Sequence, residues 1–261
     1  MPEVGEQELL TVAHEAAQAA AAELLPRFGA RAEGVQAKST PTDLVSEADV
    51  AAERAIREVL RRRRPADAVL GEEGGASGGE GDRGLRWVVD PLDGTINFLF
   101  GIPAFGVSLA CEEGDAKLAG MVLDPVRDEC FAATRSTPAT LNGQAIRASG
   151  RDKLARALVA TGFGYDAGVR SRQAAVVSRV LPRVRDIRRV GAAALDLCWC
   201  ACGRFDAYYE RGVQPWDVAA GSLIAAQAGL EVRELPASAD DAAGIVVAPA
   251  AIIDELFELV R

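Results

Sequence analysis

Two aspartates follow a short apolar run in the first half of the chain. The run at 87–89 reads as a strand, and it is followed by Asp90, Pro91, Leu92, Asp93, Gly94 and Thr95. Because proline forces a turn and lacks an N–H, this order aims both carboxylates and the Leu92 carbonyl at a common point. Such oxygens are ligands that Mg²⁺ takes, with water or phosphate completing the octahedron. If a helix starts at Gly94, its free N–H groups face the same point and could hold a phosphate. By itself, the motif is equally typical of an ordinary surface Asp-Gly turn.

Two further acidic residues stand at the ends of expected elements. Glu72, in Gly71-Glu72-Glu73, follows the short apolar run 68–70. Asp217 comes just after Pro215 and opens a helix of small residues. Taken singly, each is more typical of a structural role, and Asp217 suits a helix start.

Helices and strands are mixed along the whole chain. Helical periodicity covers 5–25, 47–63, 172–181, 192–202, 215–228 and 250–260. Strand-like runs cover 68–70, 87–89, 105–111, 118–123, 129–133, 157–161, 204–209, 230–233 and 244–247. From 105 to 147 the strands follow one another directly and end in an Asn142-Gly143 hairpin turn, whereas after about 150 strands and helices alternate. The pattern predicts a mixed α/β (α+β) fold of two layered sheets covered by helices. We expect a single unit over 1–261, with an N-terminal α+β half (1–150) that carries the metal motif and a C-terminal α/β half (151–261).

The composition is that of a globular, acidic protein. The chain has 261 residues, is 49% hydrophobic, and carries a formal net charge of -9. An acidic chain repels polyanions, so nucleic acid and anionic membranes are unlikely partners, and an anionic substrate would need a local cation. No apolar stretch is long enough to span a membrane. The odd number of cysteines, five, does not suggest a disulfide framework and favours a cytoplasmic location.

Four segments together resemble the inositol monophosphatases, within the lithium-sensitive, magnesium-dependent sugar phosphatases, and bacterial (actinobacterial) members most of all. They are G-E-E at 71–73, W-V-V-D-P-L-D-G-T-I-N-F at 87–98, G-A-A-A-L-D-L-C at 191–198 and P-W-D-V-A-A-G at 215–221. The order and spacing are those of the family, and the likeness runs from Lys38 to the C-terminal helix. It implies a layered αβαβα sandwich, a homodimer, and Mg²⁺-dependent hydrolysis of a small phosphate monoester, most simply inositol monophosphate.

The resemblance also implies a role for each motif residue. Glu72, Asp90 and the Leu92 carbonyl would hold one metal, and Asp90, Asp93 and Asp217 a second. Glu72 and Thr95 would orient or deprotonate the attacking water, while Gly94 and Thr95 would give N–H groups to the phosphate. The remaining substrate contacts would come from Asp93, Asp217, Gly191, Ala192, Ala193 and Glu210. Two metals in such a site can stabilise the attacking and leaving oxygens together.

Asp49 and Lys38 each allow two interpretations. Ser46-Glu47-Ala48-Asp49 resembles a capping box that opens a helix, which would make Asp49 a structural residue. The family likeness instead places Asp49 beside the metals, accepting a hydrogen bond from the Thr95 hydroxyl, and we favour this catalytic reading. Lys38 is a plain loop residue by sequence, but the family has a lysine there near the metal site.

Ala192 departs from the family pattern, because many relatives carry a hydroxyl residue after the pocket glycine. This departure bears on the identity of the substrate more than on the type of reaction. The same chemistry could act on histidinol phosphate, a 3'-phosphoadenosine nucleotide or a fructose bisphosphate. An alternative of another class is a regulatory protein that binds a transcription complex, for which the basic run 61–64 is the only sequence feature.

Overall fold

The larger of two main sheets carries the turn at 90–95. The computed structural model describes residues 5–29, 36–37, 44–45, 47–78 and 84–261. Eight strands form this sheet in the order β10-β9-β8-β7-β6-β5-β3-β4. Their bounds are β3 (Ala68–Gly71), β4 (Gly75–Ser77), β5 (Leu85–Asp93), β6 (Gly106–Glu113), β7 (Ala116–Asp124), β8 (Glu129–Thr134), β9 (Thr137–Leu141) and β10 (Gln144–Ala145). All neighbours are antiparallel except β3 and β5, which run parallel. Glu72 directly follows β3, and Asp90 lies in the last part of β5.

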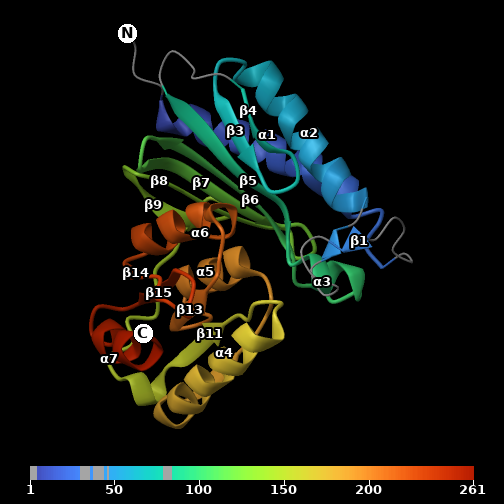
Figure 1. Ribbon diagram of the computed structural model, residues 1–261. Helices are drawn as coiled ribbons and strands as arrows, with labels where there is room; N and C mark the ends of the chain where they lie inside the picture. The colour runs from blue at the N-terminus through green and yellow to red at the C-terminus, as the bar shows by residue number, and fades with distance from the viewer. Residues whose placement is uncertain (1–4, 30–35, 38–43, 46, 79–83) are drawn as a thin grey trace.

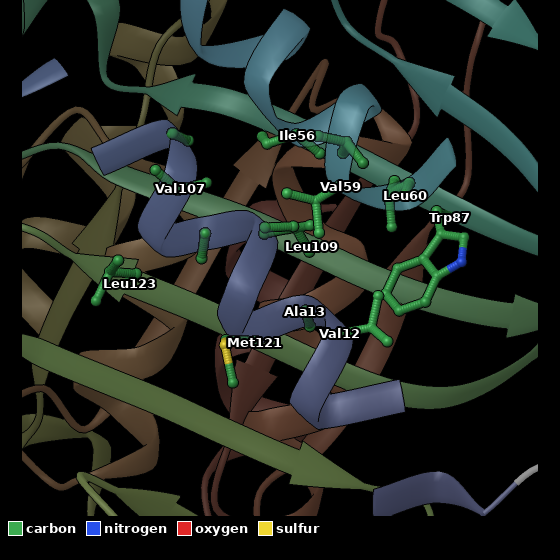
Figure 2. Packing of buried hydrophobic residues seen from close by; sticks show 14 of the residues in the cluster. Val12, Ala13, Ile56, Val59, Leu60, Trp87, Val107, Leu109, Met121 and Leu123 are labelled. Carbon is green, nitrogen blue, oxygen red and sulfur yellow. The ribbon is translucent and has the colours of Figure 1, made fainter. Parts of the chain in front are cut away.

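Two long helices cover one face of this sheet. They are α1 (Glu6–Leu24) and α2 (Glu47–Arg63), and both lie across the strands in Figure 1. The inward stripe of α1 is rich in alanine, so the helix packs closely against the sheet. Figure 2 shows Val12 of α1 and Ile56 of α2 against Val107, Leu109 and Met121, all of them buried.

The second sheet comes from the C-terminal part of the chain. Its five strands have the order β12-β11-β13-β15-β14 and are β11 (Leu158–Thr161), β12 (Asp186–Arg188), β13 (Ala207–Arg211), β14 (Glu231–Leu235) and β15 (Gly244–Ala248). β11 runs parallel to both β12 and β13. The helices α4 (Ala167–Val180) and α7 (Ile253–Val260) contribute apolar residues to the core on one face of this sheet.

A middle layer of two helices joins the sheets. α5 (Ala193–Ala201) and α6 (Pro215–Gln227) lie between them (Figure 1). Small residues let α6 approach closely: a Cβ on Gly120 of β7 would lie 3.0 Å from the Ala220 backbone. The expected layered αβαβα sandwich is confirmed.

Short elements complete the chain. They are β1 (Gln36–Ala37), β2 (Leu44–Val45), α3 (Thr95–Leu99) and the 3₁₀ turns η1 (Leu154–Arg156) and η2 (Leu181–Arg183). In the part of the chain that the structure describes, no helix is long and apolar enough to cross a membrane.

Most expected elements are present, with a few differences. α4 begins at Ala167 instead of 172, because the Asp166 side chain caps it by accepting from the Val169 N–H at 2.9 Å. The strand β9 was not expected, since Pro138 interrupts its pattern. The Asn142-Gly143 turn is confirmed: Leu141 pairs with Gln144, and both turn residues have positive φ.

Candidate active site

The turn after the apolar part of β5 folds back on its own first aspartate. Asp90 Oδ1 accepts from the Leu92 N–H at 3.0 Å, and the pairing of β5 with β6 shifts register between Asp90 and Asp93. Gly94 has a φ of 94°, and α3 begins at the next residue. A Cβ on Gly94 would lie 3.0 Å from the Ala104 carbonyl and 3.2 Å from Ala192 Cβ. Glycine is therefore required there by both backbone conformation and space.

The Thr95 hydroxyl joins α3 to α2. Thr95 Oγ1 lies 3.0 Å from Asp49 Oδ1 and 3.1 Å from the Leu92 carbonyl, and each can accept its proton. Asp49 is the third residue of α2 and is fully buried. The hydrogen bond expected between Thr95 and Asp49 is present. Ser46, the other half of the expected capping box, lies outside the described residues.

Glu72 stands in a tight turn that an ion pair on α2 supports. The buried carboxylate of Glu53 accepts from the backbone N–H of Glu73 at 2.7 Å and of Gly74 at 2.9 Å. Arg57 donates to Glu53 at 2.6 Å and to the Gly75 carbonyl at 2.7 Å. The turn that carries Glu72 is thus tied to α2, the helix that carries Asp49.

Asp93 and Asp217 link the site to the middle layer. The two carboxylate oxygens of Asp93 accept from the N–H of Ala193, at 3.1 Å, and of Ala194, at 2.7 Å, where α5 begins. Asp217 is the third residue of α6 and accepts from the Gln214 N–H at 2.7 Å in a capping box. Ala193, which we expected among the substrate contacts, donates its N–H to Asp93 in this structure.

The opposite wall is formed by β13 and its neighbours. Glu210 lies near the end of β13, and its Oε2 accepts from the Tyr208 hydroxyl at 2.7 Å. The guanidinium of Arg189 lies 6.0 Å from the centroid of the Phe163 ring. Arg189 lines the cavity together with two further basic residues, Arg172 and Arg211.

Most of the residues expected at the site line one cavity of about 590 Å³. They are Glu72, Asp90, Leu92, Asp93, Gly94, Thr95, Gly191, Ala193, Glu210 and Asp217. Ala192 is 1% exposed and packs against Gly94 behind the wall. Asp49 reaches the site through Thr95. Lys38 lies outside the described residues, so its place near the metals stays a prediction.

The carboxyl groups repel one another. Burial raises the pKa of Asp90 well above its usual range, and the charges of Glu72, Asp93 and Asp217 raise it further. Burial likewise raises the pKa of Asp93 to about 7, against the opposing effect of the Ala194 N–H. The pKa of Asp217 is raised well above normal by burial and then by Asp93. A bound cation would offset this repulsion.

The donor chemistry fits a hard divalent cation, since every candidate ligand atom is a carboxylate or carbonyl oxygen. As the side chains stand, however, the described residues contain no group of three or more His, Cys, Asp or Glu side chains gathered closely enough to hold one ion. Asp90, Asp93 and Asp217 instead accept hydrogen bonds from different backbone N–H groups: Asp90 from Leu92, Asp93 from Ala193 and Ala194, and Asp217 from Gln214. The five cysteines are all free thiols and are not part of the cavity lining.

Several residues near the site were not found from sequence. Glu53 and Arg57 had a usable signal: Glu53 follows Asp49 by one helical turn on the buried face of α2, and Arg57 follows by another. Asp196 stands in the motif at 191–198 but was given no role; it is buried on α5 and its Oδ1 has no hydrogen-bond partner among the described residues. Gly162 had no sequence signal.

The chain is similar to known proteins in both sequence and fold. The sequence profile of the inositol monophosphatase family matches residues 6–257. An inositol-1-monophosphatase of Mycobacterium bovis is 47% identical over 232 residues, which cover 85% of this chain and 79% of that protein. A protein of Pseudomonas aeruginosa named Nus factor SuhB is 42% identical over 241 residues, covering 89% and 87%. Among solved structures, SuhB of Mycobacterium tuberculosis is 41% identical with a TM-score of 0.82, covering 98% of this chain and 97% of the other. The extragenic suppressor protein suhB of Bartonella henselae is 34% identical with a TM-score of 0.88, covering 97% and 98%. The chain therefore belongs to the inositol monophosphatase family.

Proposed function

We propose that this phosphatase uses Mg²⁺ to hydrolyse a small phosphate monoester, most simply inositol monophosphate to inositol and phosphate. The observation that carries the proposal is that Glu72, Asp90, Asp93 and Asp217 all line one cavity beside the turn at 90–95. The family is in general metal-dependent. The mycobacterial relative's name supports an inositol phosphate as substrate.

The metal ligands that we propose come from both sides of the cavity. Glu72, Asp90 and the Leu92 carbonyl would hold one Mg²⁺, and Asp90, Asp93 and Asp217 a second. Bound divalent cations supply positive charge to the phosphoryl oxygens and make water more acidic. Because each buried carboxylate is attracted to a bound cation, the cations would offset the repulsion among the carboxylates. We therefore expect the site to bind the cations strongly.

The attacking water would be oriented by Thr95 and Glu72. When the Thr95 hydroxyl donates its hydrogen bond to Asp49, its lone pairs are left free to accept a hydrogen bond from the attacking water. The backbone N–H groups of Gly94 and Thr95 would receive the phosphate. Asp49 is thus proposed to act by keeping the hydroxyl in one orientation.

The alcohol part of the substrate would lie toward Gly191, Ala193 and Glu210, all of which line the cavity. Ala192 brings no hydroxyl to this wall and is itself buried. Glu210 can accept hydrogen bonds from hydroxyl groups, which favours a polyol over a less hydroxylated alcohol.

The basic run at the end of α2 does not favour the alternative role as a regulatory binding protein. Arg62 and Arg63 form ion pairs with Glu15, and Arg61 forms one with Glu58. Arg64 donates to Asp67 at 2.8 Å. All four arginines thus have acidic partners within the fold, and the name Nus factor SuhB belongs to the relatives.

The decisive experiment is a substrate panel measured with and without metal. We expect inositol 1-phosphate to be hydrolysed faster than histidinol phosphate, a 3'-phosphoadenosine nucleotide and fructose bisphosphate. Activity should require Mg²⁺ and be inhibited by lithium. Full turnover in excess EDTA would refute the metal-dependent chemistry, and a preference for another panel member would replace the substrate. The homodimer and the cytoplasmic location stay predictions.

A further inference from the structure

The carboxylate of Glu210 is held from one side by a tyrosine of its own strand. Residues 208 and 210 lie on the same face of β13, because strand side chains alternate. The Tyr208 hydroxyl, on a side chain with no exposed surface, donates to Glu210 Oε2 at 2.7 Å. Tyr209 points to the other face, where it packs in a different apolar cluster.

From the other side the same carboxylate rests against a glycine. Gly162 directly follows β11, the parallel neighbour of β13, and Thr161 pairs with Tyr209. A Cβ on Gly162 would lie 1.9 Å from Glu210 Oε2 and 2.1 Å from Cδ. Since the φ of Gly162 is not in the left-handed region, its backbone conformation does not require glycine. A larger residue is disfavoured at position 162 only because the Glu210 carboxylate occupies the space that its Cβ would fill.

Polar and charged groups around Glu210 affect the pKa of its carboxyl group. Burial raises the pKa of Glu210, while the Tyr208 hydroxyl and the charge of Arg189 lower it. Asp196 is buried on α5, where burial and then the charge of Glu210 raise its pKa. The Tyr208 hydroxyl and the Arg189 guanidinium are the groups that favour the charged form of Glu210.

We propose that Tyr208 and Gly162 are positioning residues that fix the Glu210 carboxylate and thereby set the preference for hydroxyl-rich alcohols. The inference rests on the proposed function, in which Glu210 contacts the alcohol and not the phosphate. A tyrosine that merely satisfied a buried polar group would contribute to stability alone. A positioning tyrosine must also change how the enzyme discriminates between alcohols.

The test compares inositol 1-phosphate with 4-nitrophenyl phosphate, whose alcohol has no hydroxyls for Glu210 to bind. Tyr208→Phe should lower kcat/KM for inositol 1-phosphate about tenfold, on the scale of a lost hydrogen bond to a charged group, and change the aryl phosphate less than twofold. Gly162→Ala should act in the same direction. Tyr209→Phe is the matched control, since it removes the neighbouring hydroxyl on the opposite face, and it should alter neither substrate.

A double variant separates positioning from general damage. In a Glu210→Gln background, Tyr208→Phe should add little to the loss on inositol 1-phosphate, because both changes act on one contact. Equal losses on both substrates, or additive losses in the double variant, would overturn the positioning role and leave the phosphatase function intact. If Gly162→Ala fails to fold, the tyrosine variants still decide.

The wild-type protein is measured first, so that a wrong substrate can be distinguished from a wrong positioning role of Tyr208 and Gly162. Absence of inositol 1-phosphate turnover, with the aryl phosphate still hydrolysed, would overturn the proposed substrate and with it the alcohol contact of Glu210. Normal wild-type turnover together with an unchanged selectivity in Tyr208→Phe would overturn only the inference about positioning.

Discussion

On the side of the cavity formed by β5, Asp90 and Asp93 accept hydrogen bonds from backbone amides, whereas on the side formed by β13 Glu210 accepts one from the Tyr208 side chain. Backbone donors stay in place whenever the fold is intact. A side-chain donor is lost with a single substitution. The wall with the proposed metal ligands is therefore tied to the fold, while the proposed alcohol wall can be retuned by a few residues.

The largest effect should come from the acid that both proposed metals share. Asp90→Asn should lower kcat by roughly 10³-fold, since bound metals contribute several kcal/mol to such reactions. Burial and the neighbouring acids make it costly to place the Asp90 carboxyl group in the metal-free fold, and asparagine removes that cost, so the metal-free variant should melt at a higher temperature than the metal-free wild type. Steady-state kinetics and melts in EDTA check both parts. Retained activity would show that the wall formed by β5 is not the catalytic one.

The second-largest loss of kcat is expected for Asp49→Asn. Asparagine caps helices as well as aspartate does, but its neutral amide accepts the Thr95 hydrogen bond more weakly. On the orienting role, kcat at saturating Mg²⁺ should fall about 100-fold, the scale of a general acid–base contribution. Glu47→Gln, at an exposed acid in the same first turn of α2, is the matched control and should leave kcat unchanged. If Asp49→Asn melts lower and yet keeps most of its kcat, Asp49 has only a structural role.

Glu53→Gln should weaken the support of the Glu72 turn without removing a ligand. We expect the Mg²⁺ concentration for half-maximal activity to rise about tenfold, the lower range for residues that hold a metal ligand in place, with kcat at saturating Mg²⁺ nearly unchanged. Direct Mg²⁺ binding by calorimetry gives a second readout. Glu58→Gln, on the exposed side of α2, is the control. An unchanged Mg²⁺ requirement would show that the turn holds its shape without Glu53.

The smallest effect is expected for Asp196 on α5 and concerns stability alone. Burial raises the pKa of Asp196 well above its usual range, followed by the charges of Glu210 and Asp93. Because the folded-state pKa lies above the unfolded value of about 3.9, the folded protein binds the extra proton and loses stability as pH rises above that value. Asp196→Asn mimics the neutral acid, so its gain in melting temperature over wild type should be larger at pH 8 than at pH 5. A gain that does not depend on pH would mean that Asp196 is ionised when folded.

Features that depend on neighbouring residues could be predicted from the sequence. The turn at 90–95 follows from Pro91 and Gly94, the hairpin from Asn142-Gly143, and the helices α2 and α6 from their periodicity and start signals. The bond from Thr95 to Asp49 came from the family likeness and is present.

Features that join distant segments became visible in the folded chain. Asp93 holds the start of α5, Glu53 holds the turn of Glu72, and Gly162 makes room for Glu210. No pattern of neighbouring residues reveals such pairs, because each is set by how strands and helices stack and not by local conformation. Ala193 illustrates the same limit: its motif was recognised, yet the direction of its N–H depends on where the packing of α5 places it against β5.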